Sequence, residues 1–195
     1  DVWALTRGEV DTTTLLPTTL TPAVLAQRKR LVTSRAAENL YWLGRYTERA
    51  DNTIRLARLA LEHLGGEEQS STPLLQWLTQ LAQIDSLVLP GVPSAVQARR
   101  VFERSIIASL ASPDGATGVG YNMRALKMAA ATVRERLSQE HWATIVRAEE
   151  EVFQRCAQLA AQGDYAPNQA LRILKDASDH LAAITGAQTA RMTRD

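Results

Sequence analysis

SRAAENLYWLGRYTERADNTIRLARLALEHL, residues 34–64, is the stretch of sequence that decides the fold. Eight of its side chains recur at spacings of three and four, which places them on one face of an α-helix. They are Leu40, Leu43, Thr47, Ala50, Ile54, Ala57, Leu61 and Leu64. Burying each large member contributes about 1.5–3 kcal/mol before entropy is subtracted. The pattern predicts a long core helix that Ser34 caps and Gly65-Gly66 ends.

The opposite side of this predicted helix carries charge. Its polar residues fall within about 120° of one another on the helix surface, and several are three or four positions apart, so they can touch. They are Glu38, Arg45, Glu48, Arg49, Asn52 and Arg55. A solvated face with weak ion pairs, each worth less than about 1 kcal/mol, is the simplest interpretation.

Large apolar groups on or beside the charged side favour a central helix instead. Tyr41, Trp42, Leu56 and Leu59 stand there, and Asn39 and Asp51 stand at the edges of the apolar stripe. We therefore expect protein to cover both flanks, with the charged side forming a hydrogen-bonded network or an interface. Gly44 costs about 1 kcal/mol in mid-helix relative to Ala, so we expect another backbone to approach it closely.

The rest of the chain predicts further helices. Thr72 caps and Pro73 opens one over about 73–86, Ser94 caps one to about Leu110, and another covers about 119–137. Ser138 caps a helix to about 161, and the last helix ends near Gly186. Residues 1–20 read as a short extended segment. The fold class is therefore all-α, a helical bundle or array of about six helices with a short extended N-terminal segment.

Composition excludes several classes of function. The chain has 195 residues, enough for one domain, and a net charge of +1, so we expect no nucleic-acid partner. No apolar run approaches the ~20 residues of a membrane span, so we expect no membrane partner and a cytoplasmic location. Cys156 is the single cysteine, which rules out a disulfide within the chain, and its pattern predicts a buried apolar role.

The sequence lacks the common motifs of metal and phosphate sites. The residues three positions before His63, His141 and His180 are Ala60, Ser138 and Ala177, so no Glu-x-x-His motif is present. Asp176 and His180 could form half a metal site, but a surface ion pair is the better interpretation. The Gly-rich stretch 115–120 reads as a loop, because it lacks the Gly-Lys-Ser/Thr ending of a phosphate loop. We assign no catalytic and no metal-binding residue.

Two stretches resemble the alpha-E family, which is all-helical. The twenty positions 34–53, with Arg55 after them, resemble the family's opening signature, and Glu38 and Glu48 match its signature glutamates. Residues 133–142 resemble an Arg-rich helix that ends in Ser-x-Glu-x-Trp. The matching positions are Arg134, Ser138, Glu140 and Trp142. Ala129 and Ala131 depart from the family pattern, which has Asn and Arg there.

The resemblance also sets the domain boundaries that we expect. Residues 1–5 resemble the last strand of a circularly permuted ATP-grasp domain, so residues 1–20 would be a remnant of that domain or a linker. Residues 21–195 would be the N-terminal part of an alpha-E domain, because residues 186–195 resemble the lead-in to a further helix of the family.

The resemblance implies a partner domain of a permuted ATP-grasp ligase, which joins a carboxylate to an amine. The charged side of the first helix would bind the ligase or a peptide-like substrate, with Arg134, Glu140 and Trp142 as a second patch. We expect no cofactor in this domain, since ATP and Mg²⁺ belong to the partner. Two alternatives stay open: a catalytic domain that acts on an amide through Glu38 and Glu48, and a purely structural scaffold.

Overall fold

A computed structural model describes residue 8 and residues 33–66, 70–113, 117–161 and 167–192. Asp1–Thr33 and Ser34–Asp195 form separate units, and the predicted extended segment at 1–20 lies outside the described residues apart from Gly8. The described residues contain no strand. Their helices are α2 (Ser34–Gly65), α3 (Thr72–Ile84), α4 (Arg99–Ser109), α5 (Val119–Thr132), the 3₁₀ turn η1 (Arg134–Arg136), α6 (Gln139–Ala161) and α7 (Pro167–Met192).

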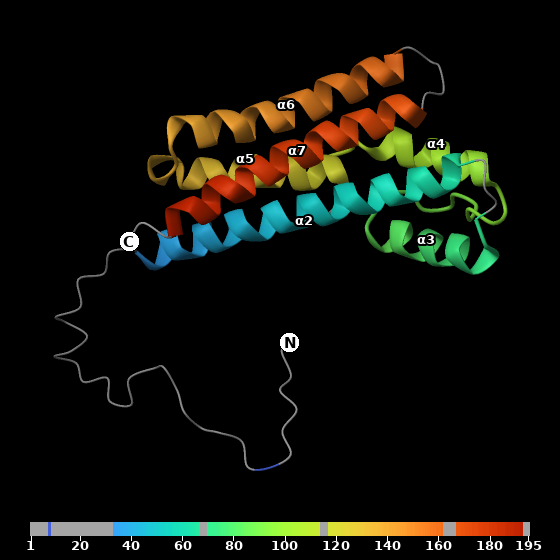
Figure 1. Cartoon of the computed structure of the whole chain (residues 1–195), viewed down its shortest axis with the longest axis horizontal. Helices are drawn as coiled ribbons and strands as arrows, with labels where there is room; N and C mark the ends of the chain where they lie inside the picture. The colour runs from blue at the N-terminus through green and yellow to red at the C-terminus, as the bar shows by residue number, and fades with distance from the viewer. Residues whose placement is uncertain (1–7, 9–32, 67–69, 114–116, 162–166, 193–195) are drawn as a thin grey trace. The chain divides into compact units, whose positions relative to one another are not determined.

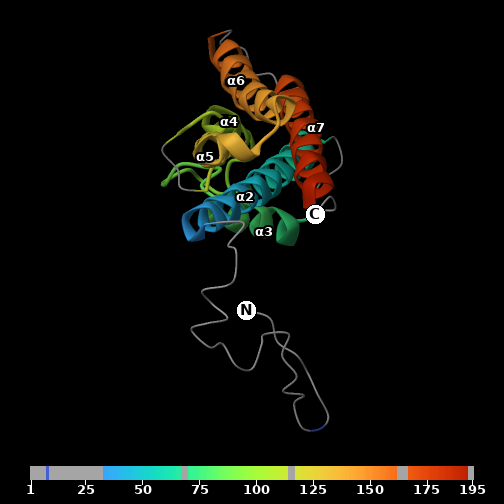
Figure 2. The same cartoon turned by 90° about the vertical axis from the view of Figure 1, so that its left-hand side faces the viewer.

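The four long helices of the second unit form a closed bundle. α2 packs against α5 and α7, and α6 packs against the same two helices from the other side (Figure 1). α3 and α4 also contact α2, and both views place α3 on the side of α2 away from α6 (Figure 2). The prediction of an all-helical bundle of about six helices is confirmed.

The apolar stripe of α2 is the core of this bundle. Seven of its eight predicted members are buried, and Thr53 and Ala60 join them. Leu40 is the exception, with 37% of its surface exposed. Leu40 lies two turns before Thr47, which Gln188 of α7 contacts, whereas α7 continues only to Met192. The first turns of α2 therefore have less of α7 to pack against.

Tertiary contacts move the start of α4 away from the predicted cap. Ser94 does not cap this helix, which begins at Arg99. The Ser94 hydroxyl accepts a bond from the Gln97 amide at 3.3 Å, which closes a separate turn. The Arg99 guanidinium then donates to the carbonyls of His63 and Leu64, both at 2.7 Å. Arg99 thereby satisfies open carbonyls at the C-terminus of α2.

Other helix ends also differ from prediction. Thr72 is not the cap of α3 but its first residue, after Ser71, and α3 ends at Ile84. α5 ends at Thr132, because the chain changes to the turn η1 instead of continuing to 137. Gly186 does not end α7, which runs to Met192. Ser138 does cap α6 as predicted, since its hydroxyl accepts a bond from the His141 amide at 3.1 Å.

The close backbone approach predicted at Gly44 is wrong, and Gly120 provides one instead. A Cβ atom added at Gly44 would meet nothing within 4 Å, because this position faces solvent. A Cβ atom at Gly120 would lie 2.8 Å from the carbonyl carbon of Ala111 and from the carbonyl oxygen of Ser112. Backbone atoms cannot move aside easily, so only glycine fits at the start of α5.

Alanine substitutions at these two glycines should have opposite effects on stability. Gly120→Ala should lower the free energy of unfolding by about 1–3 kcal/mol, because the new methyl group overpacks against backbone. Gly44→Ala should raise it by about 0.5–1 kcal/mol, because helical glycine is entropically costly and space is free. Urea unfolding followed by circular dichroism measures both, and a destabilised Gly44→Ala variant would contradict the structure.

One carboxyl group is buried at the junction of α4 and α2. The Glu103 side chain is 0% exposed, its Oε2 lies 3.3 Å from Arg100 Nη1, and its Oε1 has no hydrogen-bond partner among the described residues. Burial raises the pKa of Glu103, although Arg100, Arg99 and Arg104 oppose the change. The folded chain therefore binds a proton at Glu103 more tightly than the unfolded chain does.

Glu103→Gln should change how stability depends on pH. A raised pKa means that the wild-type carboxyl becomes less favourable to folding as pH rises through its folded-state value. Glutamine carries no charge, so the variant should gain stability relative to wild type as pH rises from the ordinary carboxyl range towards neutrality. Urea unfolding of both proteins across this range provides the test. A stability difference that stays constant or shrinks with rising pH would be inconsistent with a raised pKa.

Candidate functional site

The charged side of α2 is open to solvent in the described structure. Five of the six predicted residues are exposed and Arg49 is half-buried; the exposed ones are Glu38, Arg45, Glu48, Asn52 and Arg55. Arg45 Nη1 lies 4.0 Å from Glu48 Oε2, at the limit of an ion pair, and Arg55 Nε lies 2.8 Å from Asp51 Oδ2. The expectation that protein covers both flanks is therefore wrong within this unit, because α3, α4, α5 and α7 contact α2 and still leave these charged residues exposed.

Aromatic side chains continue the exposed surface at the edge of α2. Tyr41 is 62% exposed and Trp42 39% exposed, and their rings meet edge to face with centroids 5.4 Å apart. Trp42 also stacks on Tyr46, with centroids 5.8 Å apart and an interplanar angle of 28°. Tyr46 packs against the core. The three rings therefore form a continuous strip from solvent to the interior.

Beside this strip lies a groove of about 510 Å³ between α2 and α5, which we call the α2–α5 groove. α2 contributes Asn39, Trp42 and Tyr46. α5 contributes Tyr121, Arg124, Ala125, Met128, Ala129 and Thr132, and Pro113 of the preceding loop completes the lining. Ala125 and Ala129 are one turn apart on α5, and their small side chains leave the space open. Ala129 is also a position where the sequence departs from the family pattern.

A buried polar cluster fixes α5 against α2 at one end of the groove. The Asn122 carboxamide donates to the Thr53 hydroxyl at 3.1 Å and to the Thr117 carbonyl at 2.7 Å. The Thr53 hydroxyl donates in turn to the Arg49 carbonyl at 2.6 Å. Asn122 is 1% exposed, so these bonds form away from water. They set which residues of α2 and α5 face each other.

The phenol of Tyr46 has a perturbed acidity in this setting. Burial raises the pKa of Tyr46, and the neighbouring Tyr121 phenol raises it further, while Arg49 opposes both. Tyr46 therefore stays protonated at neutral pH and can donate or accept a hydrogen bond in the groove. Arg49, the half-buried member of the predicted set, lies close enough to act on this phenol.

The second predicted patch forms the corner between η1 and α6. The Arg134 guanidinium lies over the Trp142 ring, 5.5 Å from its centroid, and Arg134 Nη1 donates to the Leu137 carbonyl at 3.2 Å. Trp142 packs against the core, and Glu140 is exposed in the first turn of α6. The structure brings Arg134 and Trp142 together with Ser138 as a capped corner. A binding role for this patch stays a prediction.

The candidate metal half-site is divided between two ion pairs. Asp176 pairs with Arg155, and His180 Nδ1 lies 3.8 Å from Glu151 Oε2. The part of the chain that the structure describes holds no group of three or more His, Cys, Asp or Glu that could bind a metal. Cys156 is buried, as predicted, and burial raises the pKa of its thiol to about 11. A thiol that stays protonated is a poor nucleophile.

Sequence reasoning missed most of the α2–α5 groove. It noted Trp42 and Asn39 only as flanking residues, and it assigned no role to Tyr46, Tyr121, Arg124 or Met128. A signal was present in α2, because Arg35, Asn39, Trp42 and Tyr46 follow spacings of four, three and four. Such spacings place them on one face of the helix. No pattern in the sequence of α5 indicated its groove residues, because which of them line the groove depends on how α5 packs against α2.

The described unit is thus an all-helical bundle. One side of its central helix α2 is buried, and the other side exposes charged and aromatic residues. A family model matches residues 32–195, and its description reads "Alpha-E: A predicted alpha-helical domain with a conserved ER motif". The chain belongs to the Alpha-E family, as the resemblance predicted. Glu-Arg pairs stand at 48–49, 103–104 and 135–136, and the first lies within the signature stretch of α2. No curated protein and no solved structure matches the chain.

Within the described residues, every helix is too short or too polar to cross a lipid bilayer.

Asn122→Ala should loosen the α5 side of the groove. The variant leaves the part-buried Thr117 carbonyl and the buried Thr53 hydroxyl with fewer partners, which should lower the free energy of unfolding by about 1–3 kcal/mol. The exposed Asn168 of α7 is a matched control, and Asn168→Ala should change stability by no more than about 0.5 kcal/mol. Equal effects of the two substitutions in urea unfolding would argue against the buried cluster.

Proposed function

We propose that this domain is a non-catalytic helical partner of a circularly permuted ATP-grasp ligase that forms amide bonds. In this proposal, the exposed side of α2 binds the ligase or its peptide-like substrate. ATP and Mg²⁺ bind in the ligase, and the present domain supplies a docking surface. The proposal takes its partner from the family resemblance and its docking surface from the arrangement of α2.

One observation carries the proposal: α2 exposes charge and aromatic rings together. Arg45, Glu48, Asn52 and Tyr41 are exposed on the side of α2 opposite its buried stripe, and Trp42 lies at the edge of this side. Arg and aromatic residues are enriched at protein interfaces, whereas a merely solvated surface gains nothing from exposed rings. The surface therefore suits a partner that presents both charged and apolar groups.

The chemistry of the charged side sets what it would recognise. Arg45, Arg49 and Arg55 offer planar forks of N–H donors that match carboxylates or phosphates. Glu48 lies 4.0 Å from Arg45, so it would orient that fork, and Asn52 would add neutral hydrogen bonds. Because these pairs are exposed, they contribute little to folding and stay available for a partner.

The geometry does not favour catalysis by Glu38 and Glu48. General acid–base catalysis by a carboxyl group needs an enclosed site that holds substrate and changes the acidity of the group. The Glu48 side chain is 64% exposed, and Glu38 is exposed in the first turns of α2. Neither lines the α2–α5 groove.

A binding experiment with matched variants tests the docking surface. The double variant Arg45→Met, Glu48→Gln removes one exposed pair of opposite charges from α2. Its control is Lys175→Met, Asp179→Asn, which removes an exposed pair on α7 whose side chains are 61% and 66% exposed. The permuted ATP-grasp protein of the native organism is immobilised, and binding is measured by biolayer interferometry. The α2 variant should bind about tenfold more weakly or worse, with the control unchanged.

Unfolding curves separate loss of binding from loss of fold. Both double variants should keep the helical content and unfolding midpoint of wild type, because all four positions are exposed. The proposal fails if the native organism's ATP-grasp protein, fused or separate, does not bind wild type. It also fails if the α2 and α7 variants bind that protein equally well.

A further inference from the structure

We propose that the α2–α5 groove binds an organic carboxylate with an aromatic or branched aliphatic body, about the size of one amino-acid residue. The proposal concerns the groove beside the exposed side of α2, and it does not depend on docking to a ligase. Three features of the groove carry it: its size and walls, its charge, and the means by which it stays open.

The size and walls of the groove fit a small apolar group. Its volume of about 510 Å³ lies within the range of ligand pockets, roughly 300–1,000 Å³. The stacked rings of Trp42 and Tyr46 form one wall, and Tyr121 and Met128 of α5 face them. Aromatic walls hold a flat ring by offset stacking, and a methionine side chain adapts to branched aliphatic shapes.

The charge of the groove selects an anion. Arg124 is the charged residue among those that line it, and its side chain is 51% exposed. The Arg124 guanidinium lies over the Phe153 ring, 4.8 Å from the centroid, which holds it in place. The Glu149 carboxylate accepts a hydrogen bond from Lys127 Nζ at 2.9 Å, and its other oxygen lies 3.9 Å from Arg124 Nε. Arg124 therefore keeps donors for a bound carboxylate.

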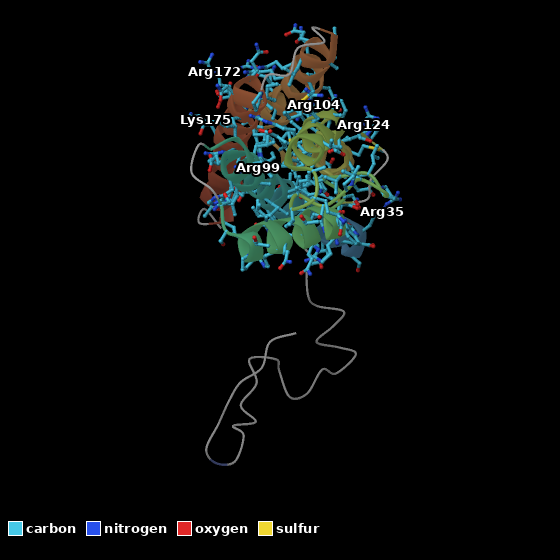
Figure 3. All side chains as sticks on the ribbon, turned by 90° about the vertical axis from the view of Figure 1, so that its right-hand side faces the viewer. Arg35, Arg99, Arg104, Arg124, Arg172 and Lys175 are labelled. Carbon is cyan, nitrogen blue, oxygen red and sulfur yellow. The ribbon has the colours of Figure 1, made fainter. Side chains whose placement is uncertain are left out.

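A second cation, Arg35, lies on α2 outside the residues that line the groove. Arg35 lies one helical turn before Asn39, on the same face of α2. In Figure 3, seen along the bundle, Arg35 and Arg124 lie on the same side of the helices, and Arg172 and Lys175 of α7 lie on the opposite side. Arg124, which lines the groove, is therefore the cation that the carboxylate of a ligand with an apolar body would meet.

The groove is open because of side-chain size rather than backbone strain. Ala125 and Ala129 are the two alanines on its α5 side, and the Asn122 cluster holds α5 in register with α2. A larger side chain at 125 would occupy the space a ligand needs without changing the charge. Ala125→Leu and Arg124→Gln therefore remove the volume and the anion contact separately.

A titration of the isolated chain with N-acetyl-L-phenylalanine tests the inference. The chain has four Trp residues, so its indole N–H groups give four NMR signals, and Trp42→Phe identifies that of Trp42. The Trp42 signal should shift in a saturable way. Binding should be about fivefold weaker or worse for N-acetyl-L-phenylalaninamide, which lacks the carboxylate, and for Arg124→Gln with the acid. Ala125→Leu should abolish the saturable shift.

Controls decide between binding in the groove and non-specific effects. Arg172→Gln removes an arginine from the opposite edge and should bind the acid as wild type does. A peptide with a free C-terminal phenylalanine distinguishes two kinds of carboxylate ligand, the C-terminus of a peptide and a single amino-acid derivative. If this peptide binds more tightly than N-acetyl-L-phenylalanine, the ligand of the groove is the C-terminus of a peptide. The inference is overturned if the Trp42 signal does not saturate, if acid and amide bind equally, or if Arg124→Gln and Arg172→Gln behave alike.

Discussion

The burial of one side of α2 between α5 and α7 is the constraint on which the whole bundle depends. Nine side chains of α2, from Leu43 to Leu64, are buried, with α3 and α4 adding to the cover, and α6 closes the ring by packing on α5 and α7. Arg99 joins α4 to the C-terminus of α2 through three carbonyls. Since a helix has two sides, fixing the apolar one also fixes which residues face solvent.

Polar contacts between helices give this arrangement its register. Asn122 joins α5 to Thr53 of α2, and the Gln188 amide of α7 donates to the Thr47 hydroxyl at 3.0 Å. Buried polar groups tolerate few alternatives, because losing a partner costs more than the bond contributes. The register brings the small residues of α5 opposite the rings of α2. The groove thus follows from the same contacts that order the core.

Local patterns were enough to predict the fold but not the surface. Helical periodicity and capping are local, so α2, α6 and the bundle could be predicted from the sequence. Ser94 failed as a cap because Arg99 starts α4 by binding the end of α2, a contact between residues 35 positions apart. The sequence could not show which of Gly44 and Gly120 lies against another backbone segment, because that depends on where the other segment packs in the fold. The α2–α5 groove was not predictable for the same reason.

The central claim is that the side of α2 left free by the core is the surface that a partner covers. Hydroxyl-radical footprinting of the domain, alone and saturated with the native ATP-grasp protein, measures this within one molecule. Tyr41 and Trp42 should lose reactivity in the complex, whereas Trp77 of α3, which is 49% exposed, should keep it. Unchanged reactivity of Tyr41 and Trp42, or equal protection of Trp77, would contradict the claim.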